Sequence, residues 1–159
     1  MNAPASAPPA RFVPQDPDFA ARVRASFGRQ RAMALIGASL ALVEAGLVEI
    51  ELPYREDLTQ QKGYVHGGIV GMIADSACGY AAYTLMPATS SLVTVEYKIN
   101  LLSPAVGERL LARGEVIKPG RTLSVTRAEV YARQGGKFVQ VAAMQQTLMT
   151  LPDTPDAPE

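Results

Sequence analysis

The spacing of apolar residues near the N-terminus predicts a helix. Phe19, Val23 and Phe27 recur at i, i+4 and i+8, which places them on one face of a helix that runs to about Leu35. Asp16-Pro17-Asp18 marks its start, because an acidic residue followed by proline is typical of a helix N-terminus. The arginines of this segment lie largely off the apolar stripe, and we expect them on a solvated face: Arg22, Arg24, Arg29 and Arg31.

Apolar and polar residues alternate with a period of two in two later regions, which predicts β-strands. Ser39–Glu44 and Leu47–Leu52 flank Ala45-Gly46 and form a predicted hairpin that Pro53 ends. Four strand-like runs fill the second half of the chain, and the first of them alternates without interruption: Val93–Leu101, Arg109–Lys118, Arg121–Arg133 and Lys137–Thr150. Since the turns between these runs are short, we expect consecutive strands to pair antiparallel.

A segment of small and apolar residues separates the two groups of strands. It begins at Gly67-Gly68, runs to about Leu85 and is stopped by Pro87. A helix that is apolar nearly all round is buried, and Asp75 together with the lack of flanking basic residues argues against a membrane span. The order of elements predicts an α+β fold, in which one long antiparallel sheet wraps around this central helix and an extra helix precedes it.

The two ends differ in composition from the rest of the chain. Residues 1–15 are rich in alanine and proline and lack the basic and apolar regions of a signal peptide. Residues 152–159 have a similar composition, and neither end can bury much apolar surface, so we expect both to be disordered. This leaves one folded domain over residues 16–151, which we expect in the cytoplasm and without a membrane partner.

Composition and charge narrow the possible functions. A chain of 159 residues that is 48% hydrophobic can bury the core of one domain. Its 15 basic and 15 acidic residues cancel, so it lacks the positive charge that nucleic-acid binding requires. The single cysteine, Cys78, excludes an internal disulfide and a multi-cysteine zinc site, and the single histidine, His66, excludes multi-histidine metal centres. We therefore expect no metal and no cofactor.

The start of the central helix has the features of an oxyanion site. Glycines at a helix start leave backbone N–H groups unshielded, and the helix dipole adds positive potential there. The glycine pair after His66 lacks the GxxxxGK pattern of a phosphate loop. A carbonyl oxygen that gains negative charge therefore fits better than a nucleotide phosphate.

Asp75 is the unusual charged residue of the central helix. A carboxylate among apolar residues needs donors or a function, and a structural acceptor for Ser or Thr hydroxyls is one interpretation. Nine residues separate it from His66, which is about 13 Å along a helix. Asp75 cannot readily reach a carbonyl held at Gly67 of its own chain. A catalytic role therefore requires a second copy with its helix antiparallel beside the first.

The segment QQKGYVHGGIVGMIADSACGYAAYTLMP, followed by VTVEYKINLLSPAVGE and PGRTL, resembles the PaaI-type hotdog-fold acyl-CoA thioesterases over roughly residues 30–151. The HGG…AD spacing together with the downstream strand carries this resemblance. It implies a six-stranded sheet around the central helix, a homodimer with shared active sites, and a tetramer.

The resemblance also implies roles for individual residues. The N–H at Gly67, with Gly68 adjacent, polarises the thioester carbonyl, and Gln60 helps to bind that carbonyl. Asp75 corresponds to the nucleophile or general base, and Thr94 to a hydroxyl that orients the water.

His66 and Gly79 require separate comment. We expect His66 to orient the loop or cap the helix rather than act as the base, and some members have a threonine where Gly79 stands here. Cys78, twelve residues from His66, is expected to be a packed thiol.

Basic residues on the later strands are candidates for the phosphates of coenzyme A. Arg121, beside the Pro119-Gly120 turn, is preferred, followed by Lys118, while Lys98 and Arg113 are weaker candidates. For each one alone, the alternative is a solvated charge on a strand. Aromatic and apolar residues near the central helix are candidates for the acyl pocket: Tyr64, Tyr80, Tyr83, Leu85 and Met86.

The sequence thus predicts an acyl-CoA thioesterase that releases a medium-chain or aromatic acid and coenzyme A. One alternative is a non-catalytic acyl-CoA-binding or regulatory hotdog module, which a missing carboxylate would favour. Another is a hotdog hydratase or dehydratase, which would need an acid–histidine pair after a strand, whereas His66 here opens a helix.

Overall fold

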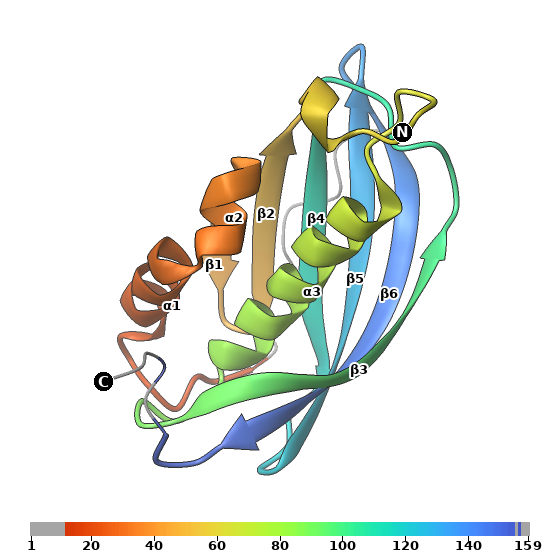
Figure 1. Ribbon diagram of the computed structural model, residues 1–159. Coiled ribbons are helices and arrows are strands. Elements are labelled where there is room, and N and C mark those ends of the chain that lie inside the picture. The colour runs from red at the N-terminus through yellow and green to blue at the C-terminus, as the bar shows by residue number, and fades with distance from the viewer. Residues whose placement is uncertain (1–11, 155, 157–159) are drawn as a thin grey trace.

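A six-stranded antiparallel sheet and a long helix on one of its faces organise the molecule (Figure 1). The structure is a computed structural model, which describes residues 12–154 and 156. Its elements follow in chain order: α1 (Phe19–Arg29), α2 (Arg31–Ile36), β1 (Ser39–Glu44), β2 (Leu47–Pro53), the 3₁₀ turn η1 (Glu56–Leu58), α3 (Gly67–Tyr83), β3 (Ser91–Leu101), β4 (Arg109–Lys118), β5 (Leu123–Gln134) and β6 (Lys137–Leu151). The expected α+β hotdog fold is confirmed.

The order of strands in the sheet is β1-β2-β4-β5-β6-β3, and all neighbours are antiparallel. The expectation that β3 pairs with the next strand in sequence is wrong, because β3 lies at the edge beside β6. The connection from β3 to β4 is too long for a tight hairpin. Hydrogen bonds from Leu102 N–H to Val141 O and from Val65 N–H to Ala105 O hold it across the end of the sheet.

Helix α3 packs directly on the middle of the sheet because both surfaces are made of small residues. Most of its apolar side chains are buried, and Ile73 and Ala77 are fully buried. At Gly114 of β4, an added Cβ atom would lie 2.3 Å from the backbone carbonyl carbon of Ala77, so only glycine allows this approach. The expected buried central helix is confirmed, and its small residues serve contact with the sheet.

The N-terminal helix differs from the expected one. The pattern predicts a single helix to Leu35, but the chain leaves the helical conformation at Gln30, with ψ 89°, and forms α1 and α2. Figure 1 shows both beside α3, over β1 and β2. The start of the helix also differs from the expected one, because α1 begins at Phe19 with Asp18 as its N-cap, two residues after Asp16. Asp16 Oδ1 accepts a hydrogen bond from Asp18 N–H at 2.9 Å in the turn before the helix.

Arg22 is not on a solvated face, contrary to expectation. Its guanidinium donates to the carbonyl oxygens of Pro87, Tyr83 and Met86 at 2.9, 3.2 and 2.8 Å, and pairs with Asp16 at 2.8 Å. The guanidinium carbon also lies 4.2 Å from the centre of the Tyr83 ring. Arg22 therefore satisfies the exposed carbonyls at the C-terminal end of α3, where a cation is favourable.

The expected disordered segment 1–15 lies mostly outside the described residues. Its last residues contact the domain, since Phe12 packs against the core and Gln15 Nε2 donates to Leu85 O at 3.1 Å. Of the expected tail 152–159, the structure describes 152–154 and 156, and Asp156 forms an ion pair with Arg29. Within the part of the chain that is described, no helix is long and apolar enough to cross a membrane.

Candidate active site

His66 caps the start of α3. Its Nδ1 accepts a hydrogen bond from Gly68 N–H at 2.9 Å, and its own N–H donates to Leu58 O at 2.9 Å. Because Nδ1 is the acceptor, the neutral ring carries its proton on Nε2. The N–H of Gly68 is therefore already used by the cap, and it is the N–H of Gly67 that has no partner among the described residues.

Gly67 combines this free N–H with an absent side chain. A Cβ atom at this position would lie 2.8 Å from Leu101 Cδ1, so glycine lets β3 close over the start of the helix. Gly67 lines a cavity of about 490 Å³ together with Gln60, Tyr64 and His66. A free N–H at a helix start, inside a cavity, is suited to a carbonyl oxygen that gains charge.

The loop before the helix orients the amide of Gln60. Lys62 N–H donates to Gln60 Oε1 at 2.6 Å, and a turn with Gly63 at φ +77° closes the backbone below it. With Oε1 held by the backbone, Nε2 remains available as a donor in the same cavity as Gly67. The predicted partners Gln60, His66 and Gly67 are thus brought together.

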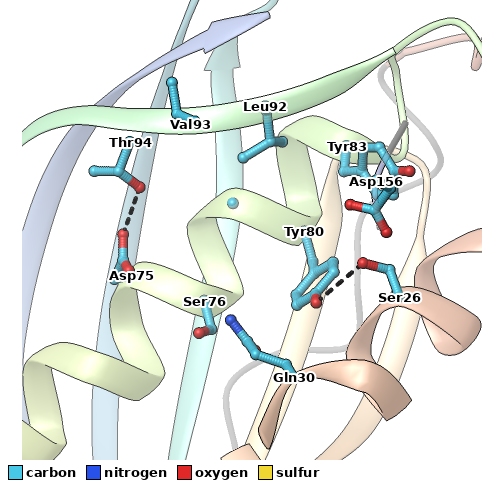
Figure 2. A pocket seen from close by; sticks show the side chains of 11 residues that line it. Ser26, Gln30, Asp75, Ser76, Tyr80, Tyr83, Leu92, Val93, Thr94 and Asp156 are labelled. Carbon is cyan, nitrogen blue, oxygen red and sulfur yellow. Dashed lines mark hydrogen bonds between the residues drawn. The ribbon is translucent and has the colours of Figure 1, made fainter. Parts of the chain in front are cut away.

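Asp75 lies halfway along α3, away from the cavity at Gly67. Thr94 Oγ1 donates to Asp75 Oδ1 at 2.8 Å, as Figure 2 shows, and Gln146 Nε2 donates to the same oxygen at 2.5 Å. Asp75 Oδ2 accepts no hydrogen bond within the described residues. Asp75 and Thr94 line a cavity of about 240 Å³. One carboxylate oxygen is therefore held and the other is free to react.

A β-bulge in β3 aims Thr94 at Asp75. The pairing with β6 shifts between Thr94 and Glu96, so one extra residue lies between them. In Figure 2, Leu92 and Thr94 point toward α3 and Val93 points away. Uninterrupted alternation would place Thr94 and Tyr97 on opposite faces of the sheet. This expectation is wrong, because the bulge brings both side chains to the face beside α3.

The two half-sites are separate within one chain. The cavity at Gly67 and the cavity at Asp75 share no lining residue. The nine residues between the two positions correspond to about 13 Å of helix. One copy alone does not bring the free N–H and the carboxylate to one carbonyl.

Comparison with known proteins identifies the family. The model of the thioesterase superfamily matches residues 62–139, which include the start of α3 and Asp75. The crystal structure of a thioesterase family protein from Silicibacter pomeroyi has 49% sequence identity and a TM-score of 0.83, covering 84% of this chain and 98% of that one. The chain belongs to the thioesterase superfamily. The resemblance read from its motifs is confirmed, and with it the expected class of enzyme, the thioester hydrolases.

Curated members of this superfamily are more distant. SSO2140 of Saccharolobus solfataricus, a protein with an esterase name, is 37% identical over 87 residues, which are 55% of this chain and 61% of that protein. The match therefore spans less than two thirds of that relative. Acyl-coenzyme A thioesterase 13 from Homo sapiens is 29% identical over 103 residues, covering 63% of this chain and 73% of the human protein.

In this thioesterase-superfamily chain, the candidates for coenzyme A binding differ in their surroundings. Lys118 and Arg121 are exposed at the β4–β5 turn, and Arg121 lines a cavity of about 460 Å³ at the C-terminal end of α3. Arg113 is buried and pairs with Glu49 at 2.7 Å and Glu115 at 3.1 Å. Because two carboxylates already neutralise it, Arg113 is a poor candidate for a phosphate.

The candidate acyl-pocket residues fall into three places. Tyr80 and Tyr83 line the cavity at Asp75, Tyr64 lines the cavity at Gly67, and Leu85 and Met86 line the cavity at Arg121.

Cys78 is a packed thiol, as expected. Burial raises the pKa of Cys78 to about 12, so the thiol is protonated at neutral pH and is not a nucleophile. No group of three or more His, Cys, Asp or Glu side chains in the described region could hold a metal ion.

Sequence reasoning missed Gln146, which is fully buried and touches both Asp75 and Thr94. Because β6 contains several polar residues, the sequence around Gln146 does not indicate which residues its side chain contacts. The parity of β6 would have been the clue, because Gln146 shares a face with Met144 and Leu148, which are buried under α3.

Proposed function

We propose that this chain hydrolyses acyl-CoA thioesters to a free acid and coenzyme A, in a homodimer whose active sites each use both chains. The observation that carries the proposal is the pair of half-sites on α3, a free N–H at Gly67 and a carboxylate at Asp75 with one free oxygen. The acyl-CoA thioesterase name of the human relative supports the substrate class.

The proposed reaction uses groups that each half-site already presents. Gly67 N–H and Gln60 Nε2 of one chain donate to the thioester carbonyl oxygen, and one such donor is worth about 10²–10³ in rate. Asp75 Oδ2 of the other chain attacks the carbonyl carbon or takes a proton from the attacking water; a positioned base gives about 10²–10⁴. In both routes the C–S bond breaks, water supplies the hydroxyl of the acid, and the thiolate gains a proton.

The free edge of β3 supports the proposed dimer. Val95, Tyr97 and Leu101 are 53%, 46% and 59% exposed on this strand, and an unpaired edge is a template for pairing with another strand. Antiparallel pairing of two β3 strands around a two-fold axis would set the two α3 helices antiparallel.

Contacts between β3 and α3 indicate where the axis lies. Leu101 contacts Gly67 and Thr94 contacts Asp75, so β3 spans the same two half-sites as the helix. Gly71 is midway between Gly67 and Asp75 on α3. A Cβ atom added at Gly71 would lie 3.9 Å from Tyr97 Oη. A two-fold axis at Tyr97 would therefore place Asp75 of one chain opposite Gly67 of the other.

The finer substrate class rests on the cavity beside Asp75. Its volume is about 240 Å³, and Tyr80, Tyr83 and Leu92 contribute to its lining. The Tyr80 ring lies 5.7 Å from Phe27 and 6.4 Å from Tyr83, which forms an aromatic wall. These features support a medium-chain or aromatic acyl group.

A thiol-release assay across short, medium, long and aromatic acyl-CoAs tests the function. We expect turnover with medium-chain or aromatic substrates, and Asp75→Asn should lower kcat at least tenfold while the dimer persists. Wild-type turnover in this variant would contradict the mechanism. Tight binding of acyl-CoA with no turnover on the whole panel would instead indicate a binding or regulatory module.

The proposal extends to assembly and location. A tetramer of two such dimers is expected from the resemblance, and light scattering of the purified protein would measure it. A cytoplasmic location is part of the same proposal, and cell fractionation would measure it.

Phosphates of coenzyme A are assigned to Arg121 and Lys118, with Arg121→Ala expected to raise KM more than it lowers kcat.

A further inference from the structure

Gln146 lies in the middle of β6, on the face of the sheet that α3 covers. Its Nε2 donates to Asp75 Oδ1 at 2.5 Å and to Thr94 Oγ1 at 2.8 Å. Thr94 Oγ1 in turn donates to the same Oδ1 at 2.8 Å. The three side chains form a closed triangle that uses both hydrogens of the amide nitrogen.

The orientation of this amide follows from the charge of its neighbour. If the amide were turned by 180°, Gln146 Oε1 would face Asp75 Oδ1, and two oxygens that only accept would repel each other. In the observed orientation, Oε1 is buried and has no hydrogen-bond partner in the described structure. A buried acceptor without a partner is destabilising, so an apolar side chain of the same size would serve packing better.

We propose that Gln146 is a positioning residue for the reaction and acts through Asp75. The inference rests on the proposed function. Two donors on Oδ1, one from Thr94 and one from Gln146, fix the rotation of the carboxylate and define Oδ2 as the reacting oxygen. Rigid support of this kind maintains reactive geometry, because small displacements of a reacting group lower the rate strongly.

The sheet holds Gln146 rigidly enough for this purpose. It pairs with Thr126 of β5 on one side and with Tyr97 of β3 on the other, and its side chain is 0% exposed. Because the bulge lies beside this pair, the same stretch of β3 and β6 positions both donors.

Gln146→Met tests the proposal, since methionine keeps the volume and removes both donors. We expect kcat to fall at least tenfold, KM to stay within twofold, and the melting temperature to equal or exceed that of the wild type. Gln145→Met is the matched control, because Gln145 is exposed on the opposite face and should keep wild-type kcat. Wild-type kcat in Gln146→Met would overturn the proposal.

A double-mutant cycle separates positioning from a general structural role. In an Asp75→Asn background, Gln146→Met should change the residual rate by less than twofold, because the residue acts only through the carboxylate. A further tenfold loss in that background would overturn the inference. If Gln146→Met fails to fold, Gln146→Leu, which also removes both donors, should show the same loss of kcat and the same cycle.

The failure of this inference can be told apart from that of the proposed function. If the wild type hydrolyses acyl-CoA and Asp75→Asn is impaired, wild-type kcat in Gln146→Met refutes the positioning role alone. If the wild type hydrolyses none of the acyl-CoA panel, the proposed function and the positioning role are both refuted.

Discussion

His66 Nδ1 accepts the N–H of Gly68 at 2.9 Å, which makes the imidazole the N-cap of α3. The cap uses the second glycine N–H and leaves the first one for a ligand. The histidine therefore has a structural task that does not require it to exchange protons.

Replacement of His66 separates the cap from a catalytic base. His66→Asn keeps a good N-cap and should retain turnover within a few-fold, whereas His66→Ala should lower the free energy of unfolding by about 1 kcal/mol. Urea unfolding and the thiol-release assay measure the two effects. A loss of kcat of a hundredfold or more in the stable His66→Asn variant would show that the imidazole acts chemically.

Arg22 links the N-terminal helix to the end of α3. Arg22→Ala leaves three carbonyl oxygens and Asp16 without their donor, and we expect a loss of about 2–4 kcal/mol in the free energy of unfolding. Arg24→Ala is the control, because Arg24 is exposed and should change stability by about 0.5 kcal/mol at most. Equal stability of the two variants would contradict this role.

Two glycines predict opposite effects of the same substitution. Gly114→Ala would drive a Cβ atom into the backbone of Ala77, so we expect severe loss of stability or failure to fold. Gly28→Ala adds a methyl group with no atom within 4 Å and lies in α1, so it should stabilise by about 0.5–1 kcal/mol. Thermal melting distinguishes the two, and a stable Gly114→Ala protein would refute the packing described for α3.

Buried acidic protons predict how stability depends on alkaline pH. Burial raises the pKa of Cys78 from 9.0 to about 12, and burial with a hydrogen bond to Glu129 raises the pKa of Tyr131 from 10.0 to about 12. The unfolded chain loses the Cys78 proton above pH 9.0 and the Tyr131 proton above pH 10.0, whereas the folded chain keeps both to a higher pH. The free energy of unfolding therefore falls as the pH rises toward about 12. Denaturation across this range should give a shallower decline for Cys78→Ala than for the wild type, and identical slopes would argue against the shift.

Cross-linking tests the proposed position of the two-fold axis. With the axis at Tyr97, Tyr97→Cys places two cysteines side by side at a separation that a disulfide can bridge. Asn100→Cys is the control, because three residues on each side of the axis separate its copies by about 20 Å. Oxidation followed by non-reducing electrophoresis should give a linked dimer for the first variant. A linked dimer for the second variant only would place the axis elsewhere.

Local patterns in the sequence were sufficient for the strands, the buried helix and the HGG start of α3. The hydrophobic period and the turn residues that define these elements are set by residues close together in the chain. As a result, β1, β4 and β6 have nearly the predicted bounds. The position of β3 beside β6 was not predictable in this way, since strand order depends on contacts between distant segments. The break at Gln30 likewise left no sign in the apolar spacing of α1.

The candidate site was predicted where a residue type had a chemical reason of its own. Gly67, His66 and Asp75 stand out because glycine at a helix start and a charge in an apolar helix are unusual. Arg22 and Gln146 were not found, because an arginine on a helix and a glutamine in a strand are ordinary in sequence. The carbonyls that Arg22 binds and the two side chains that Gln146 binds are 52 or more residues away in the chain.

The bulge in β3 also sets how much the length of this strand can vary. Val95 is the extra residue opposite β6, so a protein that lacks it can straighten the pairing while Thr94 still faces the carboxylate. Loss of one residue between Glu96 and Leu101 would instead turn the hydroxyl to the other side of the sheet. Insertions and deletions in related proteins should therefore cluster at Val95. For a relative that lacks this residue, a sequence alignment without a gap there would align Thr94 with a residue that does not face the carboxylate.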